Sequence, residues 1–212
     1  MYIAIEGVIG VGKTTLARLL QPAFDSELLL EVFEENPFLS DFYSDRQRYA
    51  FQTQIFFLLS RYHQQRRSVP EILATGKSLI SDYTFAKDSL FARINLQGDE
   101  YDMYCKVHEA LAEKIRMPDL LVYLHASTDT LMLRIATRDR SYERNMERSY
   151  IESLNQTYEE FFSKPFDGTP VLVLDTDPLD FVHFPEHLKL IENRIREVLN
   201  LSPYQAELPL DQ

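Results

Sequence analysis

The sequence predicts an α/β fold: a single doubly wound domain in which a five-stranded parallel sheet carries helices on both faces. Five short stretches have nearly uninterrupted apolar residues, as in strands that are buried on both sides. Longer stretches with helical periodicity separate them, and strands that alternate with helices are joined by right-handed crossovers into parallel sheets. The expected strands are residues 2–8, 28–33, 78–82, 120–124 and 171–174.

The expected helices fill the intervals between these strands. Their apolar residues recur every three to four positions, which is the repeat of an amphipathic helix. In a doubly wound sheet, ligands bind beyond the carboxyl ends of the strands, so functional residues are sought directly after each strand. The expected helices are residues 14–20, 46–65, 102–115, 129–137, 150–162 and 185–199.

The size and composition of the chain limit its organisation and its partners. Without an internal repeat or a Pro/Gly/Ser-rich linker, residues 1–212 are expected to form one domain. A formal net charge of -11 argues against a general nucleic-acid binder, because such proteins carry a basic face for the phosphates. No apolar stretch approaches the ~20 residues of a membrane span. The lone Cys105 suits a reducing compartment, so we expect a cytoplasmic protein with no nucleic-acid or membrane partner.

A phosphate-binding loop follows the first expected strand. Residues 7–14 read GVIGVGKT and match G-x-x-x-x-G-K-[ST] between an apolar strand and a helical pattern. Glycines let successive backbone N–H groups turn toward an anion, and the helix amino terminus adds partial positive charge. Lys13 is placed to reach the β- and γ-phosphates of ATP, and the Thr14 hydroxyl to coordinate Mg²⁺. The residues expected to bind the nucleotide are Gly7, Gly10, Gly12, Lys13, Thr14 and Thr15.

The residues that accompany this loop indicate the class of nucleotide-binding protein. The GTPase signatures D-x-x-G and N-K-x-D do not occur in the sequence. Arg134, Arg138 and Arg140 lie in residues 134–148, after the fourth expected strand, as in the arginine-rich lid of small kinases. Arg134 and Arg138 are one helical turn apart and face the same way. The sequence therefore predicts a kinase whose lid arginines stabilise the migrating phosphoryl group.

Several further blocks resemble one family. In order, the chain carries IEGVIGVGKTT, EVFEENPFLSDFYSDRQRYAFQTQIFFLLSRY, SDYTFAKDSLF, MPDLLVYLHAS and RIATRDRSYE. It resembles the deoxyribonucleoside kinases, most closely the bacterial deoxyguanosine and deoxyadenosine kinases, over residues 1–162 with a looser tail. The resemblance implies a P-loop kinase fold and transfer of the ATP γ-phosphate to the 5′-hydroxyl of a deoxyribonucleoside in nucleotide salvage.

The resemblance assigns the acid–base and metal roles. In the family, the glutamate at the end of the second strand accepts the proton of the 5′-hydroxyl, and Glu31 occupies that place. A carboxylate just past an apolar strand and facing the phosphate loop is where such a base must lie. Glu34 and Glu35 are alternative bases in the same block. Asp82, after the third strand, fits the acidic position that supports Mg²⁺ together with Thr14.

The resemblance also places the nucleoside pocket. Gln54 and Arg61 project to the same side of one helix, and with Asp88 they match the residues that read the nucleobase in the family. An amide offers both a donor and an acceptor to a base edge. Tyr43 and Glu143 match the positions that hydrogen-bond the sugar 3′-hydroxyl. This set suits guanine, adenine or cytosine, and the resemblance favours purines, with deoxyguanosine first.

One position departs from the family pattern. Many members carry an arginine directly after the acidic residue of the third strand, whereas this chain has Tyr83. In the family that arginine holds the 5′-oxygen or the catalytic glutamate, so its charge must come from elsewhere. Lys87 and the lid arginines are the alternatives.

Two other functions also fit the phosphate loop. A nucleoside-monophosphate kinase of the thymidylate type shares this fold, but it usually has an arginine in place of Tyr83 to help hold the acceptor's phosphate. A regulatory protein that binds nucleotide without turnover has no need of Glu31 or the lid arginines. The resemblance further implies a homodimer formed by the helices after the second and third strands, with Phe56 and Leu59 as contributors.

Overall fold

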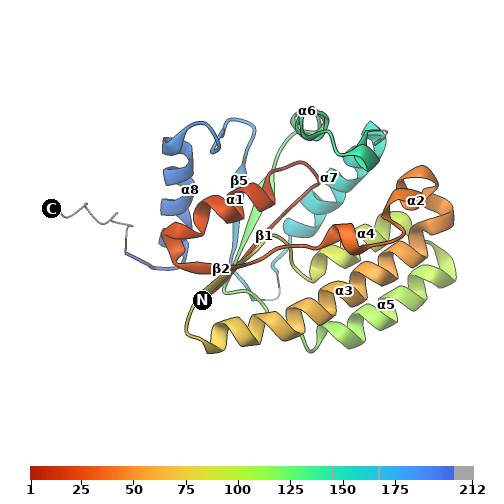
Figure 1. Cartoon of the computed structure of the whole chain (residues 1–212), viewed down its shortest axis with the longest axis horizontal. Coiled ribbons are helices and arrows are strands. Elements are labelled where there is room, and N and C mark those ends of the chain that lie inside the picture. The colour runs from red at the N-terminus through yellow and green to blue at the C-terminus, as the bar shows by residue number, and fades with distance from the viewer. Residues whose placement is uncertain (145, 167, 203–212) are drawn as a thin grey trace.

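The fold is built on one parallel β-sheet, seen in a computed structural model that describes residues 1–144, 146–166 and 168–202, except for the side chain of Glu34. In this part of the chain, five strands pair in the order β2-β3-β1-β4-β5, and each neighbouring pair is parallel. The predicted α/β sheet is confirmed (Figure 1). The strands are β1 (Tyr2–Gly7), β2 (Ser26–Leu29), β3 (Ser78–Ser81), β4 (Leu120–His125) and β5 (Val171–Asp175).

Strand β1 lies at the centre of the sheet. All six of its residues are buried, and it pairs with β3 on one side and with β4 on the other. Ile3 aligns with Ile80 of β3 and with Leu120 of β4. The loop after β1 therefore opens in the middle of the carboxyl edge, where the connections switch from one side of the sheet to the other and where ligands bind in such folds.

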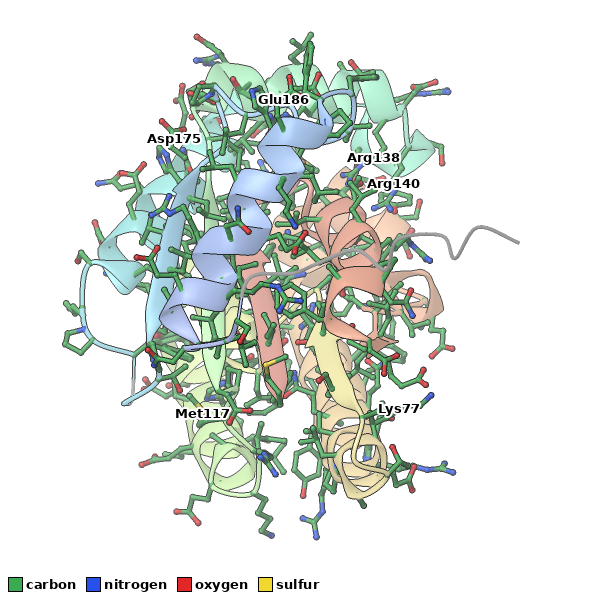
Figure 2. The ribbon with its side chains drawn as sticks, turned by 90° about the vertical axis from the view of Figure 1, so that its left-hand side faces the viewer. Lys77, Met117, Arg138, Arg140, Asp175 and Glu186 are labelled. Carbon is green, nitrogen blue, oxygen red and sulfur yellow. The ribbon has the colours of Figure 1, made fainter. Side chains whose placement is uncertain are left out.

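One face of the sheet is covered by α1 (Lys13–Leu20) and α8 (Pro185–Val198), which pack against each other. Helix α1 contacts β1, and α8 contacts β5. Viewed from this side, α8 lies in front of the strands (Figure 2). The opposite faces of both helices are largely polar, as expected for amphipathic helices that bury one stripe.

The other face carries a larger helical layer, on the opposite side of the sheet in Figure 1. It consists of α3 (Arg46–Ala74), α4 (Ala86–Asn95), α5 (Gly98–Ala112) and α7 (Arg148–Phe162). Helix α3 contacts β2 and β3, and α4 packs among the other three helices. Helices α2 (Leu39–Ser44) and α6 (Thr128–Arg138) complete the set, with 3₁₀ turns at Pro22–Phe24, Phe33–Glu35 and Ser141–Glu143.

Several elements have boundaries other than those predicted, and helix α5 begins four residues and ends three residues before the expected 102–115. Strand β2 covers Ser26–Leu29 rather than residues 28–33, because beyond Leu29 the Glu31 N–H donates to the carboxylate of Asp82 at 2.8 Å instead of to a strand. Helix α3 continues past the expected end at residue 65 and through Pro70. Its buried residues Gln65 and Val69 keep this polar stretch against the rest of the molecule.

The sequence does not predict helices α2 and α4. In α4 the polar side chains of Lys87 and Asp88 are buried, so the helix lacks the alternation of apolar and polar faces that marks an amphipathic helix. Within the described residues, no helix combines the length and the apolar character needed to cross a membrane.

Candidate active site

The loop between β1 and α1 has a backbone shape that requires glycine. Gly7 has φ +150° and Gly12 has φ +104°, both in the region that L side chains rarely adopt. A Cβ on Gly7 would lie 2.5 Å from the carbonyl oxygen of Leu124. No side chain caps α1 at Gly12, so the N–H groups of its first turn are available to an anion in the loop.

Lys13, the first residue of α1, folds back over this loop. Its Nζ donates to the carbonyl oxygens of Gly7 at 2.7 Å and of Val8 at 3.1 Å. Burial, and after it the charge of Lys87, lower the pKa of Lys13 to about 8. A phosphate bound in the loop would favour the charged form and offer the ammonium group a stronger partner than a carbonyl.

Asp82 connects the phosphate loop to the chain after β2. Its Oδ2 accepts a hydrogen bond from the Thr14 hydroxyl, and its Oδ1 accepts one from the backbone N–H of Glu31 at 2.8 Å. A hydroxyl and a carboxylate side by side at the phosphate loop are hard oxygen donors that fit Mg²⁺. The described residues contain no group of three or more His, Cys, Asp or Glu suited to a metal. A metal here would therefore need ligands from the nucleotide and water.

Glu31 lies just after β2 and carries two cationic partners. Its Oε1 accepts from Nε of Arg61 at 3.2 Å and from a terminal nitrogen of the same guanidinium, and its Oε2 accepts from Nζ of Lys87. Burial by itself raises the pKa of Glu31, but Lys87 and Arg61 outweigh it and hold the pKa well below its ordinary value. The carboxylate is therefore ionised and fixed in orientation.

Arg61 is shared between two carboxylates. Its remaining terminal nitrogen donates to Oδ1 of Asp88, whose side chain is fully buried, and its guanidinium carbon lies 4.6 Å from the centre of the Phe57 ring. Burial raises the pKa of Asp88 to about 7, against the opposing effect of Arg61. Together with Glu31 and Lys87, this makes a buried group of two anions and two cations.

A cleft opens between the phosphate loop and these charges. Gln54 lines it from α3 and is 2% exposed, yet its side-chain amide has no hydrogen-bond partner among the described residues. The donor and the acceptor of this amide can therefore pair with a ligand in the cleft. Aromatic rings form much of the remaining wall, namely Phe33, Tyr43, Phe57, Phe91 and Tyr142.

Tyr43 and Glu143 meet at one end of this cleft. The ring of Tyr43 stacks on Tyr142, with centroids 5.9 Å apart and planes 16° apart. Glu143 is 4% exposed, and both of its carboxylate oxygens accept from Arg138, at 2.7 and 2.6 Å. A hydroxyl and a buried carboxylate are thus presented to the same part of the cleft, which suits a ligand hydroxyl.

The three predicted lid arginines do not share one environment. Arg138 and Arg140 line the cleft, and Figure 2 shows them next to each other at the edge of the molecule. The guanidinium of Arg140 lies 4.1 Å from the centre of the Phe33 ring. Arg134 instead donates to the carbonyl oxygens of Val11 at 3.2 Å and Thr176 at 2.8 Å. Residue 145 of the predicted lid lies outside the described residues.

A second cavity lies against the phosphate loop. Its wall includes Thr15, Arg134 and a segment after β5, residues 177–183. Gly10 and Arg138 line both this cavity and the first cleft, so the two spaces meet at the phosphate loop. Sequence reasoning did not anticipate the segment after β5, which has no motif to mark it.

The structure also places the alternatives that the sequence left open. Tyr83 is fully buried, its hydroxyl donates to Gln64 of α3 at 2.5 Å, and it does not line the cleft. Lys87 lines the cleft and contacts Glu31. Glu35 is exposed and does not line the cleft, and the side chain of Glu34 lies outside the described part.

Because the two cavities meet at the phosphate loop, a phosphoryl group held there can pass from a donor in one to an acceptor in the other. This is the arrangement of a P-loop kinase, in which catalysis consists of positioning and charge stabilisation.

Known proteins identify the family within this class. The sequence model of the deoxynucleoside kinases matches residues 3–200. The chain is 35% identical over 201 residues to a deoxyguanosine kinase of Bacillus subtilis, covering 93% of this chain and 97% of that one. It is 35% identical over 176 residues to a deoxyadenosine kinase of Dictyostelium discoideum, covering 81% and 70%. The chain therefore belongs to the deoxynucleoside kinase family.

A solved structure supports this assignment. The deoxyadenosine kinase of M. mycoides, with dCMP and dCDP bound, superposes with a TM-score of 0.81 at 29% identity, over 93% of this chain and 100% of the other. The match extends past residue 162, so the looser carboxyl-terminal part belongs to the same fold. The predicted kinase activity is confirmed at the level of the family.

Proposed function

We propose that this chain transfers the γ-phosphoryl group of ATP to the 5′-hydroxyl of a purine deoxyribonucleoside. The observation that carries the proposal is the position of Glu31, whose ionised carboxylate shares a cleft with Lys13 of the phosphate loop. If a nucleoside binds in this cleft with its 5′-hydroxyl at Glu31, that hydroxyl faces a phosphate bound in the loop. Such a geometry supports direct in-line transfer.

In the proposed step, the 5′-oxygen forms a bond to the γ-phosphorus while the bond from that phosphorus to the oxygen of ADP breaks. Glu31 accepts the proton that the 5′-hydroxyl loses. Lys13, Arg138 and Arg140 stabilise the negative charge of the transferring group. Arg134 acts on the donor side, where it supports the phosphate loop.

The nucleotide is proposed to bind with Mg²⁺, which neutralises charge on the phosphates. Thr14 and Asp82 would supply the protein oxygen atoms that hold it. Asp82 has a further role, because its bond to the backbone of Glu31 sets the distance between the base and the phosphate loop.

The nucleobase is proposed to bind against Gln54, with Arg61 and Asp88 completing the base-reading set. The unpartnered amide of Gln54 suits the paired donor and acceptor of a base edge. Relatives named as deoxyguanosine and deoxyadenosine kinases support a purine, and we place deoxyguanosine first. The sugar 3′-hydroxyl is proposed to bind Tyr43 and Glu143.

A substrate panel tests the proposed function. We expect ATP-dependent turnover of deoxyguanosine or deoxyadenosine, and a kcat/KM about 10²-fold lower for the matching 2′,3′-dideoxynucleoside. The reason is that removing the 3′-hydroxyl leaves the buried carboxylate of Glu143 without that partner. The measurement is a coupled ATP-consumption assay with the four deoxyribonucleosides, their ribose counterparts, dideoxy analogues and monophosphates.

The same substrate panel distinguishes the proposed function from the two alternative functions. Turnover of monophosphates alone would make the chain a nucleoside-monophosphate kinase, although Tyr83 lies away from the cleft where that activity needs a cation. Binding of ATP without turnover of any acceptor would make it a regulatory nucleotide-binding protein. We further propose that the reaction serves nucleotide salvage in the cytoplasm.

The chain is also proposed to form a homodimer through α3 and α5. These helices contact each other and expose Leu59, at 40%, and Met103, at 55%. We expect light scattering at micromolar concentration to give the mass of two chains. Leu59→Arg is expected to weaken the dimer by about 10²-fold, because it places a charge in an apolar contact.

A matched substitution controls for the added charge. Leu190 on α8 is 49% exposed on the other face of the sheet, and Leu190→Arg is expected to leave the mass unchanged. The mass of one chain for the unmodified protein would contradict the proposed dimer.

A further inference from the structure

Lys87 is a buried cation in the first turn of α4. It is 6% exposed, lines the cleft between the phosphate loop and α3, and donates through Nζ to Oε2 of Glu31. The Lys87 and Glu31 side chains are 8% and 14% exposed, so their ion pair is largely shielded from water. A lysine is rarely buried unless its charge has a partner and a use.

The position of Lys87 is fixed relative to the phosphate loop. Its backbone N–H donates to the carbonyl oxygen of Thr84 at 3.3 Å. The N–H and the hydroxyl of Thr84 donate in turn to the carboxylate of Glu6, at 2.6 and 2.9 Å. Glu6 is the residue of β1 directly before the loop. The start of α4 is therefore tied by hydrogen bonds to the strand that carries the loop.

Two of the other cations around the cleft, Arg61 and Arg138, already hold carboxylate partners. Arg61 uses its Nε and both terminal nitrogens on the carboxylates of Glu31 and Asp88. Arg138 is bound by both oxygens of Glu143. Lys87 has three N–H donors, of which one goes to Glu31 in the described structure, so it has donors left for a ligand oxygen beside that carboxylate.

We propose that Lys87 is a catalytic residue that contacts the acceptor 5′-oxygen while it also orients Glu31. The inference rests on the proposed function. As the bond from the 5′-oxygen to the γ-phosphorus forms and the bond to ADP breaks, the hydroxyl proton passes to Glu31. Lys87 keeps its own proton throughout, and its charge stabilises the attacking oxygen.

This assignment explains how the site works without a cation at residue 83. Tyr83 is fully buried in a cluster with Leu29, Val69 and Leu79, and it does not line the cleft. Lys87 approaches Glu31 from a helix rather than from a strand end. A lysine suits this approach because it is a compact charge on a flexible stem, whereas a guanidinium is a planar fork.

The first test is Lys87→Met, which keeps the length of the side chain and removes its charge. We expect kcat to fall by about 10²–10³-fold and the dissociation constant for ATP to stay within about threefold. Lys87→Arg keeps a positive charge, so its kcat is expected to be at least about tenfold higher than that of Lys87→Met. The control is Lys77→Met, because Lys77 forms an exposed ion pair with Glu27 far from the cleft and its loss is expected to leave kcat unchanged.

A second test separates contact with substrate from an effect through Glu31 alone. The residual rate of Glu31→Gln is measured in single-turnover experiments with radiolabelled ATP, with and without Lys87→Met. If Lys87 touches the 5′-oxygen, Lys87→Met still lowers that residual rate by about tenfold. No further loss in the Glu31→Gln background would overturn the contact and make Lys87 a positioning residue.

Other outcomes are equally decisive. A kcat within about threefold of the unmodified protein in Lys87→Met would reject the inference while the proposed function stands. If Lys87→Met does not fold, Lys87→Gln and Lys87→Arg replace it in the same measurements, and equal rates for these two variants would reject a role for the charge. Absence of nucleoside turnover in the unmodified protein would instead overturn the proposed function.

Discussion

Replacing Glu31 by glutamine is expected to lower kcat by about 10³–10⁴-fold and to leave the dissociation constant for ATP within about threefold. The amide has the size of the carboxylate but cannot take up the 5′-hydroxyl proton. Because Lys87 and Arg61 keep the pKa of Glu31 low, the unmodified enzyme should show no loss of kcat from protonation of Glu31 between about pH 5 and pH 8. Steady-state kinetics and ATP titrations measure both quantities.

The matched control for this substitution is Glu35→Gln. Glu35 lies in the same segment but is exposed and outside the cleft. The kcat of Glu35→Gln is therefore expected to stay within about twofold of that of the unmodified protein. Thermal unfolding of both variants shows whether Glu31→Gln is folded, since it also removes the partner of two buried cations. Near-normal turnover of Glu31→Gln would move the base to Glu34 or Glu35, or remove it from the mechanism.

The sheet is predictable from the sequence because its inner strands are buried on both faces and therefore read as apolar runs. Strands β3 and β5 each end one residue from the expected position. Strand β2 differs more, because apolar character continues through Val32 and Phe33 although pairing stops at Leu29. The end of that strand is set by a side chain distant in sequence, Asp82, which takes the N–H of Glu31. A local pattern does not contain that information.

The site residues are predictable by type, but their partners are not. Arg61 and Asp88 were expected to belong to one nucleobase-reading set, and the structure places them in contact. The same arginine also binds Glu31, which lies in the loop after β2, so the proposed nucleobase pocket and the proposed base share one guanidinium. Lys87 was one of several candidate cations, and only the packing of α4 brings it to Glu31. Contacts between charged residues that are distant in the sequence produce no pattern from which they could be predicted.

The shared guanidinium leads to the second large effect. Arg61→Met is expected to destabilise the folded protein by about 3–5 kcal/mol, because it leaves the carboxylates of Glu31 and Asp88 in a buried site with Lys87 as their remaining cationic partner. It should also lower kcat, since Glu31 loses the group that holds its Oε1. Urea unfolding measures the free energy of unfolding, and Arg67→Met is the control because Arg67 forms an exposed ion pair on the same helix.

The pH dependence of the stability lost in Arg61→Met shows whether the cause is an uncompensated buried charge or the loss of side-chain packing. Burial already raises the pKa of Asp88 to about 7, and removal of Arg61 takes away the charge that opposes this shift. A carboxyl whose pKa is higher in the folded state binds more protons there, so the free energy of unfolding falls as pH rises through that pKa. Arg61→Met should therefore be less stable at pH 8 than at pH 6 by more than about 1 kcal/mol relative to the unmodified protein. The double variant Arg61→Met/Asp88→Leu should lose most of this pH dependence. An equal loss of stability at both pH values would show that Arg61 contributes packing around Phe57 rather than charge balance.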